Sequence, residues 1–64
     1  MMSDKQEVRV VWSGAMEHMN IHVNGKDIYY TNFDDIGSDG MREIAAILKK
    51  VSKSLKIKFV EDEE

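Results

Sequence analysis

The chain has 64 residues, a formal net charge of −3 and neither cysteine nor proline. A chain of this length is expected to form one domain, residues 1–64, near the lower limit at which a single hydrophobic core is sufficient. The absence of cysteine excludes disulfides and thiolate metal sites. No apolar run approaches the ~20 residues of a membrane span, so we expect a soluble, cytoplasmic protein.

The first two predicted elements are strands over residues 7–12 and 17–23. Apolar side chains alternate with other residues in both, as is typical of strands with one buried face. A four-residue turn between them would pair Val10 with Met19. The predicted inward-facing residues are Val8, Val10, Trp12, Met19, Ile21 and Val23.

Asn24-Gly25 predicts a two-residue hairpin, because both central residues of a type I′ turn need positive φ. A third strand is therefore expected over residues 26–31, antiparallel to the second. The predicted pairs are Val23 with Lys26, His22 with Asp27, Ile21 with Ile28, and Met19 with Tyr30.

An acidic connection over residues 32–37 precedes the strongest helical pattern, residues 38–55. Ser38 or Asp39 is expected to cap this helix, and lysines near its end suit the macrodipole. Steps of three and four place the apolar residues on one stripe, centred on Leu48. The stripe consists of Met41, Ile44, Ile47, Leu48, Val51 and Leu55.

Alternation resumes over residues 55–59 and predicts a short fourth strand, whereas residues 1–6 and 61–64 are expected to be disordered. The expected fold is α+β: a mainly antiparallel four-stranded sheet in the order β-β-β-α-β, with one helix packed on one face. A crossover could place the last strand beside the first and parallel to it, in spatial order 4-1-2-3. Positions beside the third strand or in a second copy's sheet are the alternatives.

So small a core predicts a homodimer. Val11, Met16 and Tyr29 are expected on the sheet face opposite the helix, where a second copy could cover them.

No motif predicts an enzyme, a metal site or a cofactor. His18 and His22 fall on a predicted strand, where four residues span ~13 Å, too far for both rings to bind one ion. The acids at 34, 35 and 39 lack the ligand spacing of an EF-hand, and no glycine-rich phosphate loop is present.

Acidic side chains outside the predicted core form the first candidate surface for binding a partner: Asp27, Asp34, Asp35, Asp39, Glu43, Glu61, Asp62, Glu63 and Glu64. In size, acidity and lack of cysteine or catalytic motif, the chain resembles the small acidic inhibitors that bacteriophages encode, some of which imitate the charge of DNA. The resemblance implies a non-enzymatic module that presents carboxylates to a basic partner, such as a DNA-binding protein of the host.

The alternative is a small nucleic-acid-binding domain that uses a lysine-rich surface. Its candidate residues are Lys49, Lys50, Lys53, Lys56 and Lys58. The acidic surface is preferred, because these lysines also suit a helix C-terminus and an edge strand.

Overall fold

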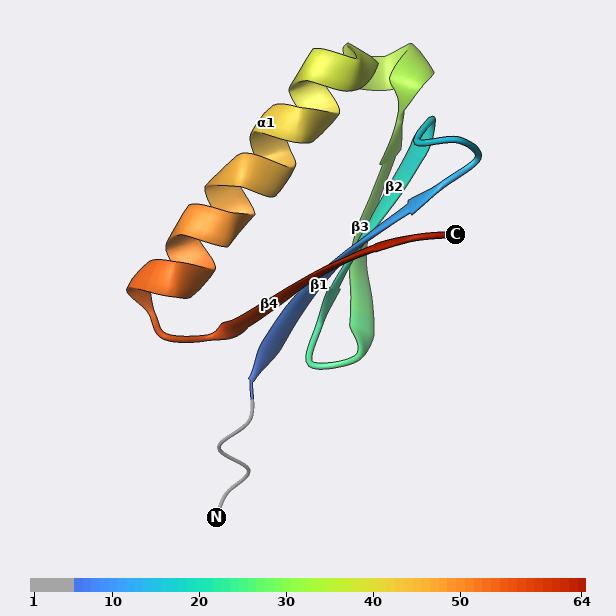
Figure 1. The fold of residues 1–64 in the computed structure, drawn as a ribbon. Helices are drawn as coiled ribbons and strands as arrows, with labels where there is room; N and C mark the ends of the chain where they lie inside the picture. The colour runs from blue at the N-terminus through green and yellow to red at the C-terminus, as the bar shows by residue number, and fades with distance from the viewer. Residues whose placement is uncertain (1–5) are drawn as a thin grey trace.

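The computed structural model describes residues 6–64 as three strands, one helix and a fourth strand (Figure 1). The elements are β1 (Glu7–Ser13), β2 (His18–Val23), β3 (Lys26–Asn32), α1 (Phe33–Ser54) and β4 (Lys58–Glu63). The predicted element order and α+β class are confirmed. Within residues 6–64, no helix is long and apolar enough to cross a membrane.

The four strands form one mixed sheet in the order β3-β2-β1-β4. β1 pairs with β2, and β2 with β3, in antiparallel fashion, whereas β1 and β4 are parallel. The prediction of a mainly antiparallel sheet is therefore wrong, although the parallel position of the last strand beside the first was one of the alternatives. α1 returns the chain to the end of the sheet where β1 and β3 begin, so β4 runs in the same direction as both (Figure 1).

The first hairpin differs in register from the prediction. Val10 lies opposite Ile21, and Trp12 opposite Met19, so the pairing is displaced by two residues. Gly14, Ala15 and Met16 all have positive φ, and the turn closes with a 3.1 Å hydrogen bond from the Glu17 amide to the Ser13 carbonyl. A two-residue displacement keeps the same side chains on the inner face.

The second hairpin turns at Asn24-Gly25, with φ of 54° and 83°, as a type I′ turn requires. Its first pairs, Val23 with Lys26 and His22 with Asp27, are those predicted. A bulge between Ile21 and His22 then shifts the pairing, so Ile21 lies opposite Tyr29 and Met19 opposite Thr31. The predicted pairs with Ile28 and Tyr30 are therefore wrong, and Tyr29 shares the inner face with Thr31.

α1 begins earlier than predicted. The Asn32 side chain caps it by accepting a 3.0 Å hydrogen bond from the Asp35 amide, so residues 33–36 are helical rather than a connection. Gly37, with φ of 75° and ψ of 168°, interrupts the helix. The long straight part begins at Ser38, where the sequence predicted the whole helix to start.

The buried hydrophobic cluster joins α1 to the first two strands. It consists of Val10, Trp12, Met19, Ile21, Met41 and Ala45. Ile44 and Leu48 are half-buried beside it, but Ile47, Val51 and Leu55 are exposed. The buried line of α1 therefore runs through Met41, Ala45 and Ser52, rotated from the predicted stripe, because small side chains let this line approach the sheet.

β4 is displaced toward the C-terminus relative to the prediction of residues 55–59. Glu61, Asp62 and Glu63, expected in a disordered tail, pair with β1 as part of β4. The backbone pairing of β4 with β1 extends beyond the apolar residues of β4, because an edge strand can carry exposed carboxylates. Of the other predicted disordered stretch, residues 1–5 lie outside the described residues.

We expect Met41→Ala to lower the free energy of unfolding by about 2–5 kcal/mol, because Met41 is fully buried and truncation leaves a cavity. Lys53→Ala, at an exposed position of the same helix, should change it by less than ~0.5 kcal/mol. Urea unfolding followed by Trp12 fluorescence, at one protein concentration, measures both. Equal effects of the two substitutions would contradict the assigned core.

Candidate functional site

β1, β3 and β4 run in the same direction and finish at one end of the sheet (Figure 1). The sequence has acidic residues after each of these strands or at its end. The turn after β1, the start of α1 after β3, and the end of β4 each supply carboxylates. We call this set the acidic edge; it consists of Glu17, Asp34, Asp35, Asp39, Glu63 and Glu64, all exposed. Glu17 was not among the predicted site residues, since only the β1–β2 turn places it beside the others.

The opposite end of the sheet is mainly basic. There β3 begins at Lys26, β4 begins at Lys58, and α1 ends near Lys53. We call the exposed lysines at this end the basic edge: Lys26, Lys50, Lys53, Lys56 and Lys58. Asp27 also lies here, where it accepts a 3.2 Å hydrogen bond from Asn20, so it is separated from the other predicted acids. The larger part of each predicted binding surface thus lies at one end of the sheet, and the two ends are opposite.

Two charged residues of the predicted sets lie along α1 between these edges. Glu43 follows Asp39 by one helical turn, and Lys49 precedes the basic end. Lys49 lines a cleft together with Arg42, whereas Glu43 is exposed elsewhere on the helix.

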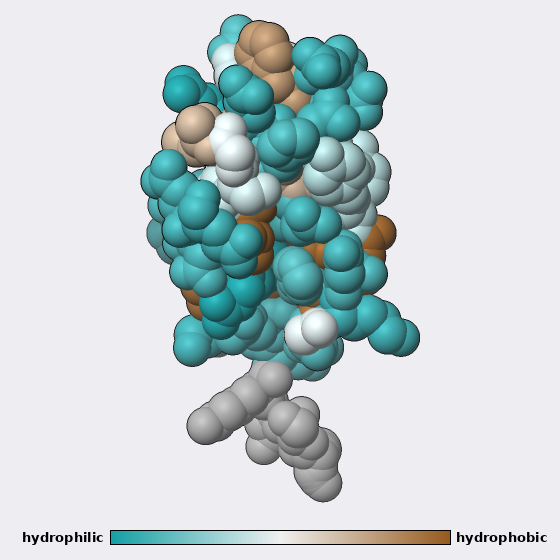
Figure 2. All heavy atoms as spheres, turned by 90° about the vertical axis from the view of Figure 1, so that its right-hand side faces the viewer, coloured by the Kyte–Doolittle hydropathy of each residue, from teal (hydrophilic) through white to brown (hydrophobic). Residues whose placement is uncertain are grey.

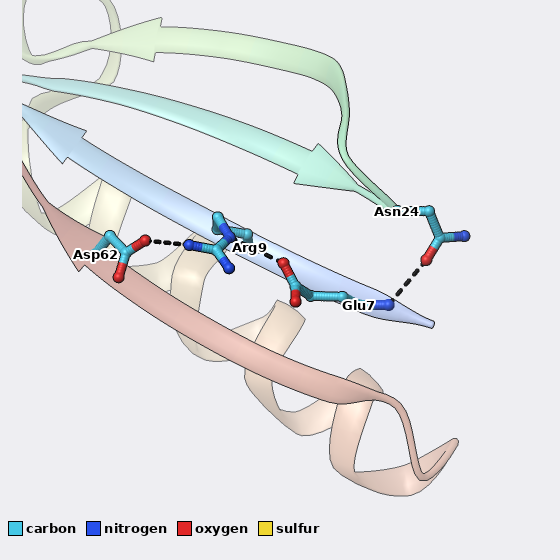
Figure 3. Close-up of polar contacts among 4 residues, drawn as sticks. All are labelled: Glu7, Arg9, Asn24 and Asp62. Atoms are coloured by element: carbon cyan, nitrogen blue, oxygen red, sulfur yellow. Dashed lines mark hydrogen bonds and ion pairs between the residues drawn. The ribbon is translucent and has the colours of Figure 1, made fainter. Parts of the chain in front are cut away.

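Asp62 is engaged within the sheet. Its carboxylate accepts a hydrogen bond from Arg9 Nη1, and Arg9 Nε donates to Glu7 Oε2 at 2.8 Å (Figure 3). The hydrogen bond from Arg9 lowers the pKa of Glu7, and hydrogen bonds to Glu7 and then Asp62 raise the pKa of Arg9. The Glu7 amide also donates to Asn24 Oδ1 at 2.8 Å, so these contacts link β1 to β4 and to the β2–β3 turn.

Glu61 is likewise engaged, on the face of the sheet that carries α1. Its carboxylate accepts the indole Nε1–H of Trp12 at 2.9 Å, which satisfies the polar atom of a buried side chain. The pair borders a cleft of about 430 Å³ between α1 and the β1–β4 half of the sheet. The cleft is lined by Trp12, Met16, Arg42, Ala45, Ala46, Lys49 and Glu61. Two cations face one carboxylate here, so the cleft is not part of the acidic edge.

The histidines lie as strand geometry predicts, on the face away from α1. His18 Nδ1 is 2.6 Å from the Tyr30 hydroxyl, and the two rings stack with centroids 6.0 Å apart. His22 lies opposite Asp27. Among residues 6–64, no three His, Asp or Glu side chains are placed to hold a metal ion.

The sheet side turned away from α1 is largely hydrophilic (Figure 2). Of the three apolar residues expected there, Met16 packs against the buried cluster and Tyr29 lies opposite Ile21 on the inner face. Val11 is half-buried. The predicted apolar outer face is therefore wrong, because the bulge in the second hairpin moves Tyr29 to the other face.

No protein-family model matches the chain, and comparisons with curated proteins and with solved structures found no match. The function therefore has to be inferred from the placement of these side chains. The main feature is the separation of acidic and basic edges.

We expect Glu61→Leu to lower the free energy of unfolding by about 1–3 kcal/mol, since it leaves the buried indole N–H without an acceptor. Glu61→Gln is the matched control, because its amide oxygen still accepts that hydrogen bond and the loss should be smaller. Urea unfolding of both variants measures the difference. A Gln variant as unstable as the Leu variant would show that the hydrogen bond is not responsible.

The contact between Arg9 and Glu7 predicts a pH-dependent stability. Because folding lowers the pKa of Glu7 from its ordinary value of about 4.5, the contribution is present above that value and is lost as pH falls through the lower folded value. The urea midpoint of the wild type should exceed that of Arg9→Gln at about pH 7, and the difference should shrink by about pH 3. A constant difference over this range would contradict an ionic origin.

Proposed function

We propose that this protein is a non-enzymatic protein-binding module that presents its acidic edge to a basic partner. The observation that carries the proposal is that three separate parts of the chain bring exposed carboxylates to one end of the sheet, while the lysines lie at the other. A nucleic-acid-binding protein is the class of partner that we propose, because its binding surface is selected to attract negative charge.

Exposed carboxylates at one end of the molecule chiefly increase the rate at which a basic partner associates. They attract an opposite charge over several ångströms and accept charge-assisted hydrogen bonds from arginine and lysine on contact. The separated lysines make the molecule a dipole, so its field also turns the acidic edge toward a basic surface. Asp34 and Asp35 contribute without strain, since negative charge is favourable in the first turn of a helix.

Five acids within residues 6–64 lie outside this edge. Glu61 and Asp62 are hydrogen-bonded to Trp12 and Arg9, and Asp27 lies among lysines. Glu43 lies along α1. We therefore assign partner binding to the acidic edge alone, and we leave these four residues and Glu7 out of it.

A second candidate function is nucleic-acid binding by the basic edge. It is favoured by the convergence of exposed lysines from β3, from the end of α1 and from β4. Asp27 interrupts this surface, and the acidic edge would repel an extended nucleic acid. These two features place it second.

The test begins with proteins captured from a cell lysate and identified by mass spectrometry. Their binding kinetics with this protein are then measured as a function of salt concentration. Replacing Asp34, Asp35 and Asp39 together by Asn should slow association about tenfold at low salt and flatten its salt dependence. Dissociation should change less. Asparagine preserves any capping role of Asp39.

The matched control replaces Lys50, Lys53 and Lys56 together by Gln, which changes the same number of charges at the basic edge. This variant should bind the captured protein at least as fast as the wild type. Retardation of labelled DNA by the wild type, lost in the lysine variant while the aspartate variant behaves normally, would instead establish the second candidate.

A further inference from the structure

A stripe of apolar side chains on α1 is left open to solvent. Ile47, Val51 and Leu55 are 52%, 47% and 62% exposed, and half-buried Ile44 begins the stripe. Their spacing of three, four and four residues places them along one side of the helix. We call these four residues the α1 stripe.

The α1 stripe faces the β3 side of the sheet. The opposite flank of α1 carries Arg42 and Lys49, which line the cleft with residues of β1 and β4. At 100° per residue, Val51 lies roughly 160° around the helix from Lys49. The stripe is therefore turned away from β4 and toward the β3 half of the sheet.

β3 is itself incompletely covered. Within residues 6–64 it is an edge strand, so the backbone groups along one of its sides have no described strand to pair with. Tyr29, on the inner face, is 46% exposed, and Ile28, at the bulge, is 56% exposed. The unpaired edge of β3 thus lies next to the solvent-exposed α1 stripe.

We propose that a second copy of this chain covers both surfaces, with the two β3 strands paired antiparallel about a two-fold axis. The sheets of the two copies then become continuous. Because both helices lie on the same side of that sheet, they run antiparallel above the junction, and each α1 stripe faces the other. This assembly does not rest on the proposed function, because its apolar contacts and its strand pairing use no residue of the acidic edge. Since the two copies run antiparallel, their charge dipoles point in opposite directions, and each acidic edge of the dimer acts through its own local field.

The charges of α1 fit this arrangement. Its first half carries Asp39 and Glu43, and its last turns carry Lys50 and Lys53. Antiparallel helices place the acidic half of one beside the basic half of the other. Glu43 and Lys50 border the α1 stripe on its solvent side, which puts Glu43 beside the partner's Lys50.

The apolar area is of the size that a dimer needs. Eight large hydrophobic residues are between 38% and 62% exposed, and all eight belong to β3, to α1 or to the C-cap of α1. We assign six of them to the contact: Ile28, Tyr29, Phe33, Ile47, Val51 and Leu55. About half of each side chain is exposed, so together these residues offer several hundred Å², compared with ~800 Å² per partner in a standard interface. Backbone pairing along β3 adds further area.

Sedimentation equilibrium of the full chain over micromolar concentrations tests the assembly. The wild type should have twice the mass of one chain, and Val51→Glu with Leu55→Glu should raise the dissociation constant at least 100-fold. Arg42→Glu, on the opposite flank of α1, is the control and should remain dimeric. Far-UV circular dichroism at each concentration confirms that the variants are folded.

A monomeric wild type would overturn the proposal and leave the stripe to a different partner. A dimer that survives the double glutamate substitution would overturn it as well, because another surface would then hold the copies together.

Single cysteines locate the strand pairing, because the natural chain has none. Cysteine placed in turn at Ile28, Tyr29 and Tyr30 should give a disulfide-linked dimer at the position nearest the two-fold axis. Val60→Cys, on the opposite edge strand, is the control and should not. Cross-linking through Val60 but not through β3 would overturn the proposal.

A charge exchange tests the orientation of the helices. Glu43→Lys alone and Lys50→Glu alone should each weaken the dimer about tenfold or less, by placing like charges together. The double variant should recover the wild-type dissociation constant. Additive weakening in the double variant would overturn the antiparallel arrangement.

Discussion

The structure depends on one small hydrophobic cluster. Val10 and Trp12 of β1, with residues of β2, meet Met41 and Ala45 of α1, and no larger core exists within residues 6–64. This contact sets the rotation of the helix, because small side chains at 45 and 52 face the sheet. The larger apolar residues of α1 consequently lie on its flank. A core of this size is marginal for an isolated domain, which gives the exposed flank a physical reason to bind another protein surface.

Strand direction converts a mixed sequence of charges into two separate surfaces. Most lysines lie within residues 49–58 and the acids lie before and after them, and the chain enters β3 and β4 among lysines and leaves them among carboxylates. Parallel pairing of β1 with β4 places both exits at the same end. An antiparallel β4 would have moved Glu63 and Glu64 to the basic edge and weakened the dipole.

Local patterns in the sequence predicted the features that depend on near neighbours. Asn24-Gly25 specified its turn and the pair of His22 with Asp27, and alternation identified the inner faces of β1 and β2. Features decided by distant contacts were missed. The bulge beside Ile21 moves Tyr29 to the inner face, and Asn32 caps a helical turn that resembled a loop because Gly37 separates it from the main helix.

In the candidate site, too, the sequence predicted only the features that do not depend on contacts between distant residues. The exposed acids were recognisable as a group, but only the sheet separates Asp27 from the rest and adds Glu17. The bonds of Glu61 to Trp12 and of Asp62 to Arg9 join residues 49 and 53 positions apart, so no local pattern could reveal them. Two adjacent apolar stripes on α1 also fit the helical period, and hydrophobicity alone does not decide which one faces the sheet.

The late arrival of β4 has a consequence during protein synthesis. β1 lies in the middle of the sheet, but one of its neighbours is made about fifty residues after it. At ~5–20 residues per second, β4 is made several seconds after β1. Until β4 pairs with β1, this edge of β1 is open, and the β4 of another incompletely folded copy can occupy it first. Exchange of β4 between copies is therefore a misfolding route that this topology permits.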